Sequence, residues 1–330
     1  MSRSAARVER IERVWYGGLA APARLRALVP LYRFLRWLHL APYRYGVRKA
    51  RRLPVPLIVV GNLTAGGSGK TPLVIALVEA LRARGFKPGV VSRGYGGSER
   101  GPLLVDDVVR PARVGDEPCL IRKRTGVAVA VGRDRARAAA LLIERGVDIV
   151  VADDGLQNPA LVRDLEICVI DGQRRFGNGH LLPAGPLREP LSRLATIDFR
   201  VCNGGAAQAG EIPMRLVGEM AVPMTTATAT RPLESFAGQR VHAVAAIGNP
   251  ERFFDGLRAH GIDVLPHGFP DHHAFVEGDF AFGDDAPVLM TEKDAVKCLA
   301  FATPDFWCIP VRAVLPAAFF EAIAACMRRV

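Results

Sequence analysis

Three features are absent or scarce in this sequence of 330 residues, and each absence excludes a class of protein. No stretch reaches the roughly 18 uninterrupted apolar residues of a membrane-spanning helix, and no cleavage site follows a short apolar core as in a secretory leader. The cysteines form no C-x-x-C pair and lie near no histidine cluster at zinc spacing, so neither a disulfide framework nor a zinc site is expected. We interpret them as buried thiols in a reducing cytoplasm. The six are Cys119, Cys168, Cys202, Cys298, Cys308 and Cys326.

Acidic residues are scarce at the amino-terminal end. Residues 1–52 contain thirteen Arg and Lys but only Glu9 and Glu12, whereas the remaining chain has 31 basic and 31 acidic residues. The net charge of +11 therefore comes from this segment alone. A basic arm that binds nucleic acid would be expected to continue into a basic patch on the folded body, so the balanced remainder argues against a nucleic-acid partner. No obligatory protein partner is indicated either.

The basic segment also holds four of the five tyrosines and two of the three tryptophans. Helical spacing of about 100 degrees per residue makes residues 28–40 a basic amphipathic helix. One face collects Leu28, Leu31, Leu35 and Leu38, and the opposite face has Arg26, Arg33 and Arg36. Arginine binds lipid phosphates while Trp and Tyr lie at headgroup depth, so we expect peripheral or monotopic binding to a membrane surface. In the alternative, the leucines pack on the body of the protein and the arginines face water.

A folded core is predicted to begin after residue 53. Residues 54–60 (PVPLIVV) form a short, β-branched apolar run of the kind buried in a parallel sheet. Further strands are predicted at residues 88–92, 127–131, 147–152 and 166–170, with a helix at residues 134–146. Strands that alternate with helices favour an α/β fold with a doubly wound, mostly parallel sheet.

A change in composition predicts the domain boundary. A Gly/Ala-rich stretch at residues 202–210 and a Thr/Ala run at residues 225–230 interrupt the α/β pattern, which resumes with a strand at residues 240–247. A helix at residues 250–260 and a strand at residues 288–291 follow. We therefore expect a membrane-associating helical segment over residues 1–53, a phosphate-loop core over 54–230 and a smaller α/β domain over 231–330.

The strongest functional signal is the sequence TAGGSGKT at residues 64–71. It follows the first predicted strand, and leucines at every fourth position then predict a helix that stops at Gly85. In a phosphate-binding loop, backbone N–H groups and the positive end of the helix converge on the phosphates of ATP, which requires glycine-rich backbone. Lys70 reaches the β and γ phosphates and Thr71 ligates Mg²⁺. The predicted nucleotide-binding residues are Thr64, Ala65, Gly66, Gly67, Ser68, Gly69, Lys70 and Thr71.

Thr64 departs from the general pattern G-x-x-x-x-G-K-[ST], which has glycine at that position. The strand before the loop and the helix after it compensate for this departure. What the loop alone does not identify is the acceptor of the phosphate.

Phosphoryl transfer also needs carboxylates for the metal and the nucleophile. The predicted strand at residues 147–152 ends in Asp153-Asp154-Gly155, which places two carboxylates at a carboxyl strand end, where open α/β sheets bind ligands. The alternative is a solvated turn, since this triplet also suits turns. Asp171 and Gly172 close the next strand in the same way, and we interpret them as a turn.

Two further groups of acids and histidines occur in loops. Asp116 and Glu117 are adjacent, and Asp271 precedes His272 and His273 far along the chain. An Asp paired with a His would be a reasonable base for a sugar hydroxyl. The residues themselves do not show that these groups meet, and each is by base rate more often a solvated polar group.

Taken together, the motifs resemble those of the tetraacyldisaccharide 4'-kinase family, the lipid A 4'-kinases of Gram-negative bacteria. The resemblance covers nearly the whole chain. The motifs that carry it are VGNLTAGGSGKTP (residues 60–72), SRGYG (92–96), GDEP (115–118), DDGLQ (153–157), LLPAGPLREP (181–190) and TEKD (291–294). Threonine is usual at the position of Thr64 in this family. Asn158 departs from it, because the family commonly has histidine there, and an Asn carries no proton at neutral pH.

The resemblance implies transfer of the γ-phosphate of ATP, with Mg²⁺, to the 4'-hydroxyl of tetraacyldisaccharide 1-phosphate at the cytoplasmic face of the inner membrane. It implies that Lys70 and Thr71 act on phosphate and metal, that Asp153 or Asp154 joins the metal, and that Asp116 is the base, oriented by His272. It places Glu117, Arg188, Glu189, Arg93 and Tyr95 near the phosphates or the sugar.

Other phosphate-loop classes fit less well. A membrane-associated partitioning-type ATPase, the main alternative, needs a signature lysine where this chain has Ala65. A GTPase needs [NT]-K-x-D for guanine recognition, whereas Lys293 and Asp294 are adjacent.

Overall fold

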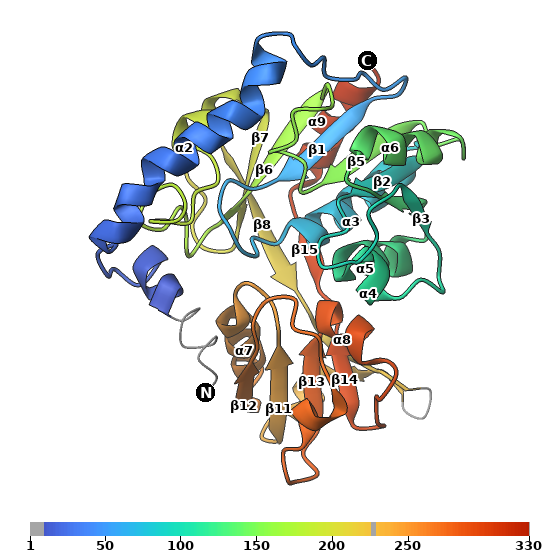
Figure 1. The fold of residues 1–330 in the computed structure, drawn as a ribbon. Coiled ribbons are helices and arrows are strands. Elements are labelled where there is room, and N and C mark those ends of the chain that lie inside the picture. Colours follow the sequence, from blue (N-terminus) through green and yellow to red (C-terminus); the bar gives the residue numbers. More distant parts are fainter. Residues whose placement is uncertain (1–9, 226–228, 330) are drawn as a thin grey trace.

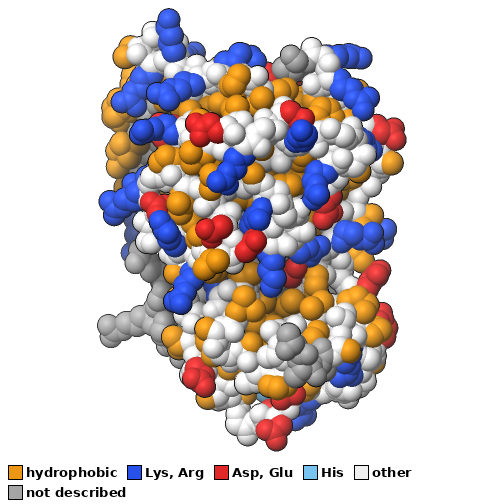
Figure 2. Space-filling model, turned by 90° about the vertical axis from the view of Figure 1, so that its right-hand side faces the viewer, with side chains coloured by type: hydrophobic (Ala, Val, Ile, Leu, Met, Phe, Trp, Pro, Cys, Tyr) orange, Lys and Arg blue, Asp and Glu red, His pale blue; other side chains and the backbone are white. Residues whose placement is uncertain are grey.

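The computed structural model describes residues 10–225 and 229–329. Their strands form two sheets that lie end to end, and helices pack on both sheets (Figure 1). Part of two expectations lies outside the described residues: positions 1–9 of the basic segment and 226–228 of the Thr/Ala run. On the face in Figure 2, Lys and Arg side chains lie interspersed with Asp, Glu and apolar side chains. This mixture agrees with the balanced charge of the chain after residue 52.

The larger sheet has nine strands, and neighbouring strands are parallel except at its two edges. In spatial order they are β15 (Arg312–Val314), β8 (Glu211–Val217), β7 (Phe199–Asn203), β6 (Leu165–Asp171), β1 (Leu57–Gly61), β5 (Ile149–Asp153), β2 (Pro88–Ser92), β4 (Val129–Val131) and β3 (Leu103–Val105). All five residues of β1 are buried, as expected for a central strand covered on both faces.

Helices cover both faces of this sheet. On one face, α3 (Lys70–Arg82), α5 (Asp116–Thr125) and α9 (Ala317–Met327) pack on Ile58 and Val60 of β1. On the other face, α6 (Arg135–Ile143) joins the cluster that contains Leu57 and Val59. A short helix, α4 (Pro111–Val114), precedes α5. The predicted doubly wound α/β architecture is confirmed.

The smaller sheet has six strands in the order β10 (Arg231–Pro232), β9 (Met220–Pro223), β14 (Phe306–Ile309), β13 (Val288–Thr291), β11 (Arg240–Ala245) and β12 (Asp263–Gly268). The last four are parallel to one another. Helix α7 (Pro250–Ala259) contributes Phe254 to the core on one face, and α8 (Glu292–Cys298) contributes Ala295 on the other. Three short 3₁₀ helices complete the fold: Leu191–Thr196, Leu233–Phe236 and Glu277–Phe280.

The chain passes between the two sheets twice. It leaves the larger sheet after β8 to form β9, and it returns from β14 to β15 and α9. Helix α9 then contacts α3, the helix that follows the phosphate loop. The division into domains at residues 53 and 230 stays a prediction.

Most predicted elements are found within two or three residues. The strands at residues 88–92 and 288–291 have the predicted bounds. The first strand starts at Leu57 instead of Pro54, because Pro54 and Pro56 lack the N–H groups that a central strand donates. The expectation for the thiols was partly wrong: all six are free, but Cys326 is exposed and Cys119 and Cys308 are only partly buried.

The predicted amphipathic helix is α2 (Ala23–Arg44), which lies along one flank of the larger sheet (Figure 1). Six of its apolar side chains face outward and are 46% to 55% exposed: Leu28, Leu31, Phe34, Leu35, Trp37 and Leu38. Leu25 and Val29 instead pack toward the body of the protein. Arg36 instead faces the protein and donates to Glu189 at 2.7 Å, and the Tyr32 hydroxyl donates to the carbonyl of Arg188. The alternative in which the leucines pack on the body is therefore wrong. No helix in the described part of the chain is long and apolar enough to cross a bilayer.

Candidate active site

The phosphate loop lies between the end of β1 and the start of α3, as predicted. Gly66 and Gly69 have φ angles of 98° and 91°, a left-handed conformation that costs glycine nothing. A Cβ at Gly69 would also lie 2.2 Å from Nδ2 of Asn203, which donates to the carbonyl of Ser68 at 2.9 Å. Glycine is therefore required at this position by both conformation and space.

The first half of the loop is held in place by the segment that carries Arg188. The backbone N–H of Ala65 donates to the carbonyl of Pro186 at 2.7 Å, and Thr64 forms an antiparallel bridge with Leu187. The Tyr16 hydroxyl donates to the carbonyl of Ala65 at 3.3 Å. Thr64 has no positive φ angle. This explains why a residue other than glycine fits at the first position of the motif.

Lys70 is buried at the start of α3, and its ammonium group is oriented by two neighbours. Its Nζ donates to Oδ1 of Asn62 at 3.2 Å and lies 3.6 Å from Oδ1 of Asp154. Asn62 also donates from Nδ2 to the carbonyl of Gly66 at 3.3 Å, so one side chain joins the lysine to the loop backbone. The sequence assigned no role to Asn62, although it lies within the motif.

The two carboxylates at the end of β5 have opposite environments. Asp154 accepts from Arg188 at 3.0 Å, and its backbone carbonyl accepts from Arg135, also at 3.0 Å. Although burial opposes ionisation, Lys70 and Arg188 lower the pKa of Asp154 to about 2. Asp153 is fully buried, and neither of its oxygens has a hydrogen-bond partner among the described residues. Burial, with the nearby carboxylates of Glu117 and Asp154, raises the pKa of Asp153 to about 7.

This donor set suits Mg²⁺. A magnesium ion in a phosphoryl-transfer site is bound by one or two carboxylates, water and the phosphates of the substrate, and not by a cage of protein ligands. In the described residues, no group of three or more His, Cys, Asp or Glu could hold a metal alone. The two unpartnered oxygens of Asp153 and the hydroxyl of Thr71 are the kind of hard oxygen ligands that complete such a shell.

A stability measurement tests the burial of Asp153. The folded state holds its carboxyl proton up to about pH 7, whereas the unfolded chain releases it near pH 3.8, so stability decreases as pH rises through that interval. Asp153→Asn cannot ionise. Its melting temperature without metal should therefore exceed that of the wild type by about 4 °C more at pH 8 than at pH 5. An equal difference at both pH values, measured by calorimetry in EDTA, would contradict the assigned environment.

Asp116 and His272 meet, although they are far apart in the chain. Nδ1 of His272 lies 3.2 Å from Oδ2 of Asp116, at the first residue of α5. His272 has a φ angle of 61°, and the ring of Tyr95 packs against its imidazole with centroids 4.9 Å apart. Lys297 of α8 lies 3.7 Å from the same carboxylate oxygen. The acid and the histidine predicted as a catalytic pair are therefore in contact.

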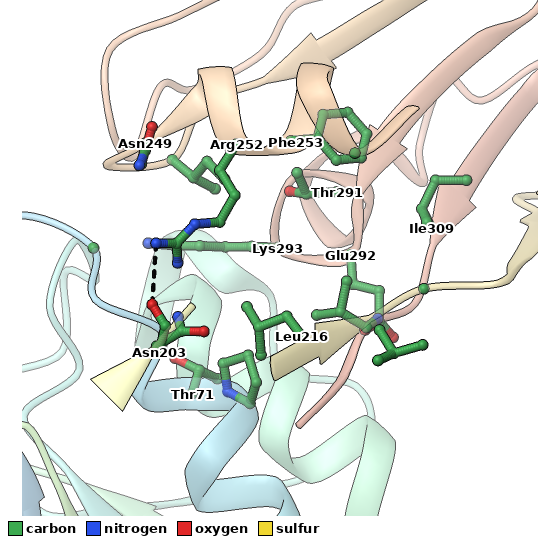
Figure 3. A pocket seen from close by; sticks show the side chains of 18 of the residues that line it. Thr71, Asn203, Leu216, Asn249, Arg252, Phe253, Thr291, Glu292, Lys293 and Ile309 are labelled. Atoms are coloured by element: carbon green, nitrogen blue, oxygen red, sulfur yellow. Dashed lines mark hydrogen bonds between the residues drawn. The ribbon is translucent and has the colours of Figure 1, made fainter. Parts of the chain in front are cut away.

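A cavity of about 710 Å³ lies between the two sheets, beside this pair. Thr71 and Asn203 reach it from the larger sheet, and Arg252, Phe253 and Thr291 reach it from the smaller one (Figure 3). The cavity begins at residues 67–72 of the phosphate loop, and Glu117 lies on its wall. Apolar side chains also line it, including Leu216, Leu257 and Ile309.

Contacts at this cavity include residues that sequence reasoning missed. Arg252 of α7 donates to Asp171 at 2.8 Å and to the carbonyl of Asn203 at 3.3 Å, which joins the two sheets. Gly248 approaches the loop so closely that a Cβ there would lie 2.1 Å from the nitrogen of Gly67. Asp171 also accepts from the backbone of Gln173, as expected for a turn. Asn203 ends β7, a strand that the sequence pattern did not predict.

The predicted substrate residues fall into three groups. Arg188 and Glu117 face the loop and its carboxylates, through the ion pair with Asp154 and the wall of the cavity, respectively. Glu189 is turned away from the loop, where it accepts from Arg36 at 2.7 Å and from Gln157 at 3.0 Å. Arg93 and Tyr95 are both exposed, with Tyr95 at the mouth of the site against His272.

Comparisons with known proteins agree on one family. The family model described as tetraacyldisaccharide-1-P 4'-kinase matches residues 22–328. The chain is 56% identical to the tetraacyldisaccharide 4'-kinase of Stenotrophomonas maltophilia over 94% of both chains, and 52% identical to that of Xanthomonas euvesicatoria over 94% of this chain and 93% of the relative. A crystal structure of LpxK from Aquifex aeolicus, an apo form in complex with ATP, superposes with a TM-score of 0.74 at 28% identity and covers 92% of this chain and 98% of its own.

Proposed function

Since this chain belongs to the tetraacyldisaccharide-1-P 4'-kinase family, we propose that its active site lies between the two sheets, with the loop at residues 64–71 holding ATP and Asp116 serving as the base. The reaction is transfer of the γ-phosphate of ATP to the 4'-hydroxyl of a tetraacylated disaccharide 1-phosphate. The observation that carries the proposal is the contact between Asp116 and His272 beside the cavity that also opens onto Lys70 and Thr71.

The loop positions the nucleotide. Its backbone N–H groups would hold the phosphates, and Lys70, whose ammonium group is oriented by Asn62 and Asp154, would bind the β and γ oxygens. The apolar lining of the cavity suits the base of ATP, because a purine ring gains from burial against side chains such as Leu216 and Phe253. Both halves of ATP therefore have a place in one continuous cavity.

Asp153 and the hydroxyl of Thr71 would hold Mg²⁺. Asp153 has no other partner among residues 10–225 and 229–329, whereas Asp154 is already paired with Arg188 and Lys70. We therefore assign the direct contact to Asp153 and an orienting role to Asp154. When bound, the ion neutralises charge that develops on the phosphate oxygens.

Asp116 accepts the proton of the 4'-hydroxyl as that oxygen attacks the γ phosphorus and the bond from phosphorus to the leaving oxygen of ADP breaks. His272 donates from Nδ1 to Asp116 and so keeps the carboxylate oriented toward the sugar. Glu117 and Arg188 face the phosphates on either side. Asp116 belongs to the larger unit, whereas His272 and Lys297 contact it from the smaller one. The base is therefore oriented only when the two units are in contact.

The amino-terminal helix supports action at a membrane surface. Its exposed leucines and Trp37 face outward, and its arginines supply positive charge for anionic headgroups. A second cavity of about 570 Å³ lies under α2, between Arg33, Arg36, Trp37 and the segment of residues 179–191. Apolar walls with two arginines suit a lipid that carries a phosphate. We place the protein at the cytoplasmic face of the inner membrane, where such a substrate is accessible to ATP.

Removing the exposed leucines tests the membrane surface. The triple variant Leu31→Gln, Leu35→Gln and Leu38→Gln should bind anionic lipid vesicles at least about tenfold more weakly, because it loses apolar area that the bilayer would cover. Flotation with vesicles measures this. A matched control replaces the exposed Val108, Val276 and Leu299 by Gln. Equal binding by both variants would remove α2 from the membrane contact.

A direct assay tests the reaction. The protein is incubated with Mg-ATP and tetraacyldisaccharide 1-phosphate, and mass spectrometry should detect the addition of a single phosphate to the lipid. Hydrolysis of ATP without any change in the lipid would contradict the proposed kinase activity and would favour an ATPase.

A further inference from the structure

The motif TEKD at residues 291–294 lies in the smaller sheet, and three of its four residues have evident structural roles. The Thr291 hydroxyl caps α8 by accepting from the backbone of Asp294. Asp294 is fully buried and accepts from the backbone of Ala246 at 2.9 Å. Glu292 accepts two hydrogen bonds from Arg124 of α5, at 2.7 and 2.6 Å, which ties the smaller sheet to the larger one. Lys293 neither caps the helix nor joins the backbone of the two units, so its role needs a separate explanation.

Lys293 lies at the point where the catalytic groups of both sheets meet. Its Nζ is 3.3 Å from Oε1 of Glu117, 3.2 Å from Oδ1 of Asp271 and 3.3 Å from Nε2 of His272. Its side chain is 16% exposed. Although burial opposes its charge, the carboxylates of Glu117 and Asp271 raise the pKa of Lys293 above its usual value. Lys293 is therefore a cation whose three donors are all directed at specific partners.

The contact with His272 has a chemical consequence. An ammonium group only donates hydrogen bonds, so Nε2 of His272 must be the acceptor and carries no proton. The single proton of the neutral imidazole is then on Nδ1, the atom that faces Asp116. In the other tautomer, the lone pair of Nδ1 would face the carboxylate and a proton on Nε2 would face the ammonium group. Both contacts would be repulsive, and Oδ1 of Asp271 lies 3.8 Å from Nε2, beyond hydrogen-bond distance, so it does not offset this repulsion.

We propose that Lys293 is a positioning residue that holds His272 in the tautomer with its proton on Nδ1, so that the imidazole always donates to Asp116. The tautomer follows from hydrogen-bond chemistry alone. The contribution of this tautomer to catalysis rests on the proposed function, in which Asp116 is the base. Lys293 acts through His272, and its contacts with Glu117 and Asp271 hold the ammonium group in the required place.

An NMR experiment on the full-length protein reads the tautomer directly. Two-bond couplings from ring protons to nitrogen in ¹⁵N-histidine-labelled protein distinguish protonated from unprotonated ring nitrogens, and loss of its signals in His272→Asn assigns the resonances. Wild-type His272 should show a protonated Nδ1. In Lys293→Met this preference should be weakened, with a population protonated at Nε2, although Asp116 still favours a proton on Nδ1; Lys293→Arg should retain the wild-type pattern because arginine also donates.

Two controls separate this role from a structural one. Glu292→Gln weakens the tie to Arg124 between the sheets but leaves the contacts of His272 unchanged, so it should reduce thermal stability without altering the tautomer. Lys123→Met removes an exposed lysine from α5 and should change neither. If Glu292→Gln shifts the tautomer as much as Lys293→Met does, the effect arises from general loosening and the proposal is overturned.

Kinetics then connect the tautomer to turnover. Lys293→Met should lower kcat by about 10-fold to 100-fold, as is typical for groups that orient a catalytic residue, with a smaller change in the KM for ATP. A wild-type His272 protonated at Nε2, or an unchanged tautomer in Lys293→Met, overturns the proposal even if the enzyme phosphorylates the lipid. A shifted tautomer with wild-type kcat overturns its catalytic part. Failure of the wild type to phosphorylate lipid would instead contradict the proposed function.

Discussion

Asp116→Asn is expected to lower kcat for lipid phosphorylation by about 100-fold to 10,000-fold, the range that general base catalysis contributes. Asparagine has the shape of aspartate and still accepts from His272 through its amide oxygen, but it takes no proton from the sugar hydroxyl. The KM for ATP should change little, because the role proposed for Asp116 is on the acceptor. Steady-state kinetics with both substrates varied would measure the two effects separately.

The matched control is Asp107→Asn. Asp107 is an exposed carboxylate outside α5. It pairs at 2.9 Å with Arg122 of α5, the helix that begins at Asp116. Its loss removes one negative charge close to Asp116 in sequence without touching His272, so kcat should stay near the wild-type value. If Asp116→Asn also retained wild-type turnover, Asp116 would have no place in the mechanism.

Lys70→Met is expected to reduce kcat/KM for ATP by at least about 100-fold, since it removes a buried positive charge that we propose binds the phosphates. Methionine keeps most of the apolar stem, so α3 should still form. Without Lys70, Asp154 also loses one of the three cations that lower its pKa, and the pair with Arg188 remains. Titration calorimetry with Mg-ATP would measure the loss of binding directly.

Lys87→Met serves as the control because Lys87 is exposed and lies before β2, away from the loop. Melting temperatures of both variants show whether they are folded. Tight binding of Mg-ATP by a folded Lys70→Met protein would show that the loop backbone holds the phosphates without the lysine.

Local patterns predicted the parts of the site that lie within one segment. The spacing of Gly66, Gly69 and Lys70 predicted the loop because strand, loop and helix follow one another directly in the chain. Asp153 was predicted because an apolar strand ends there. Periodicity also predicted α2, but it did not predict which face of the helix turns outward. That choice depends on Glu189, which attracts Arg36 from another part of the chain.

Contacts between distant segments were beyond reach of spacing arguments. Asp116 and His272 are 156 residues apart, and only the resemblance to a family joined them before the structure did. Asn203 and Lys293 could not be assigned for the same reason. Asn203 supports the loop from the end of β7, and Lys293 meets His272 from α8. Each contact depends on how distant segments are placed in the folded chain. No local pattern in a single sequence encodes that placement.

The course of the chain between the sheets has a consequence for truncated proteins. Because β15 and α9 return to the larger sheet, the smaller sheet is an insertion, and a premature stop codon cannot remove it cleanly. Shortening the chain from its carboxyl end first deletes α9, which packs on the helix that starts at Lys70. Loss of the last few turns would thus weaken the nucleotide site before it affects the sheet that carries His272. Only an internal deletion that rejoins β8 to β15 would isolate the larger unit.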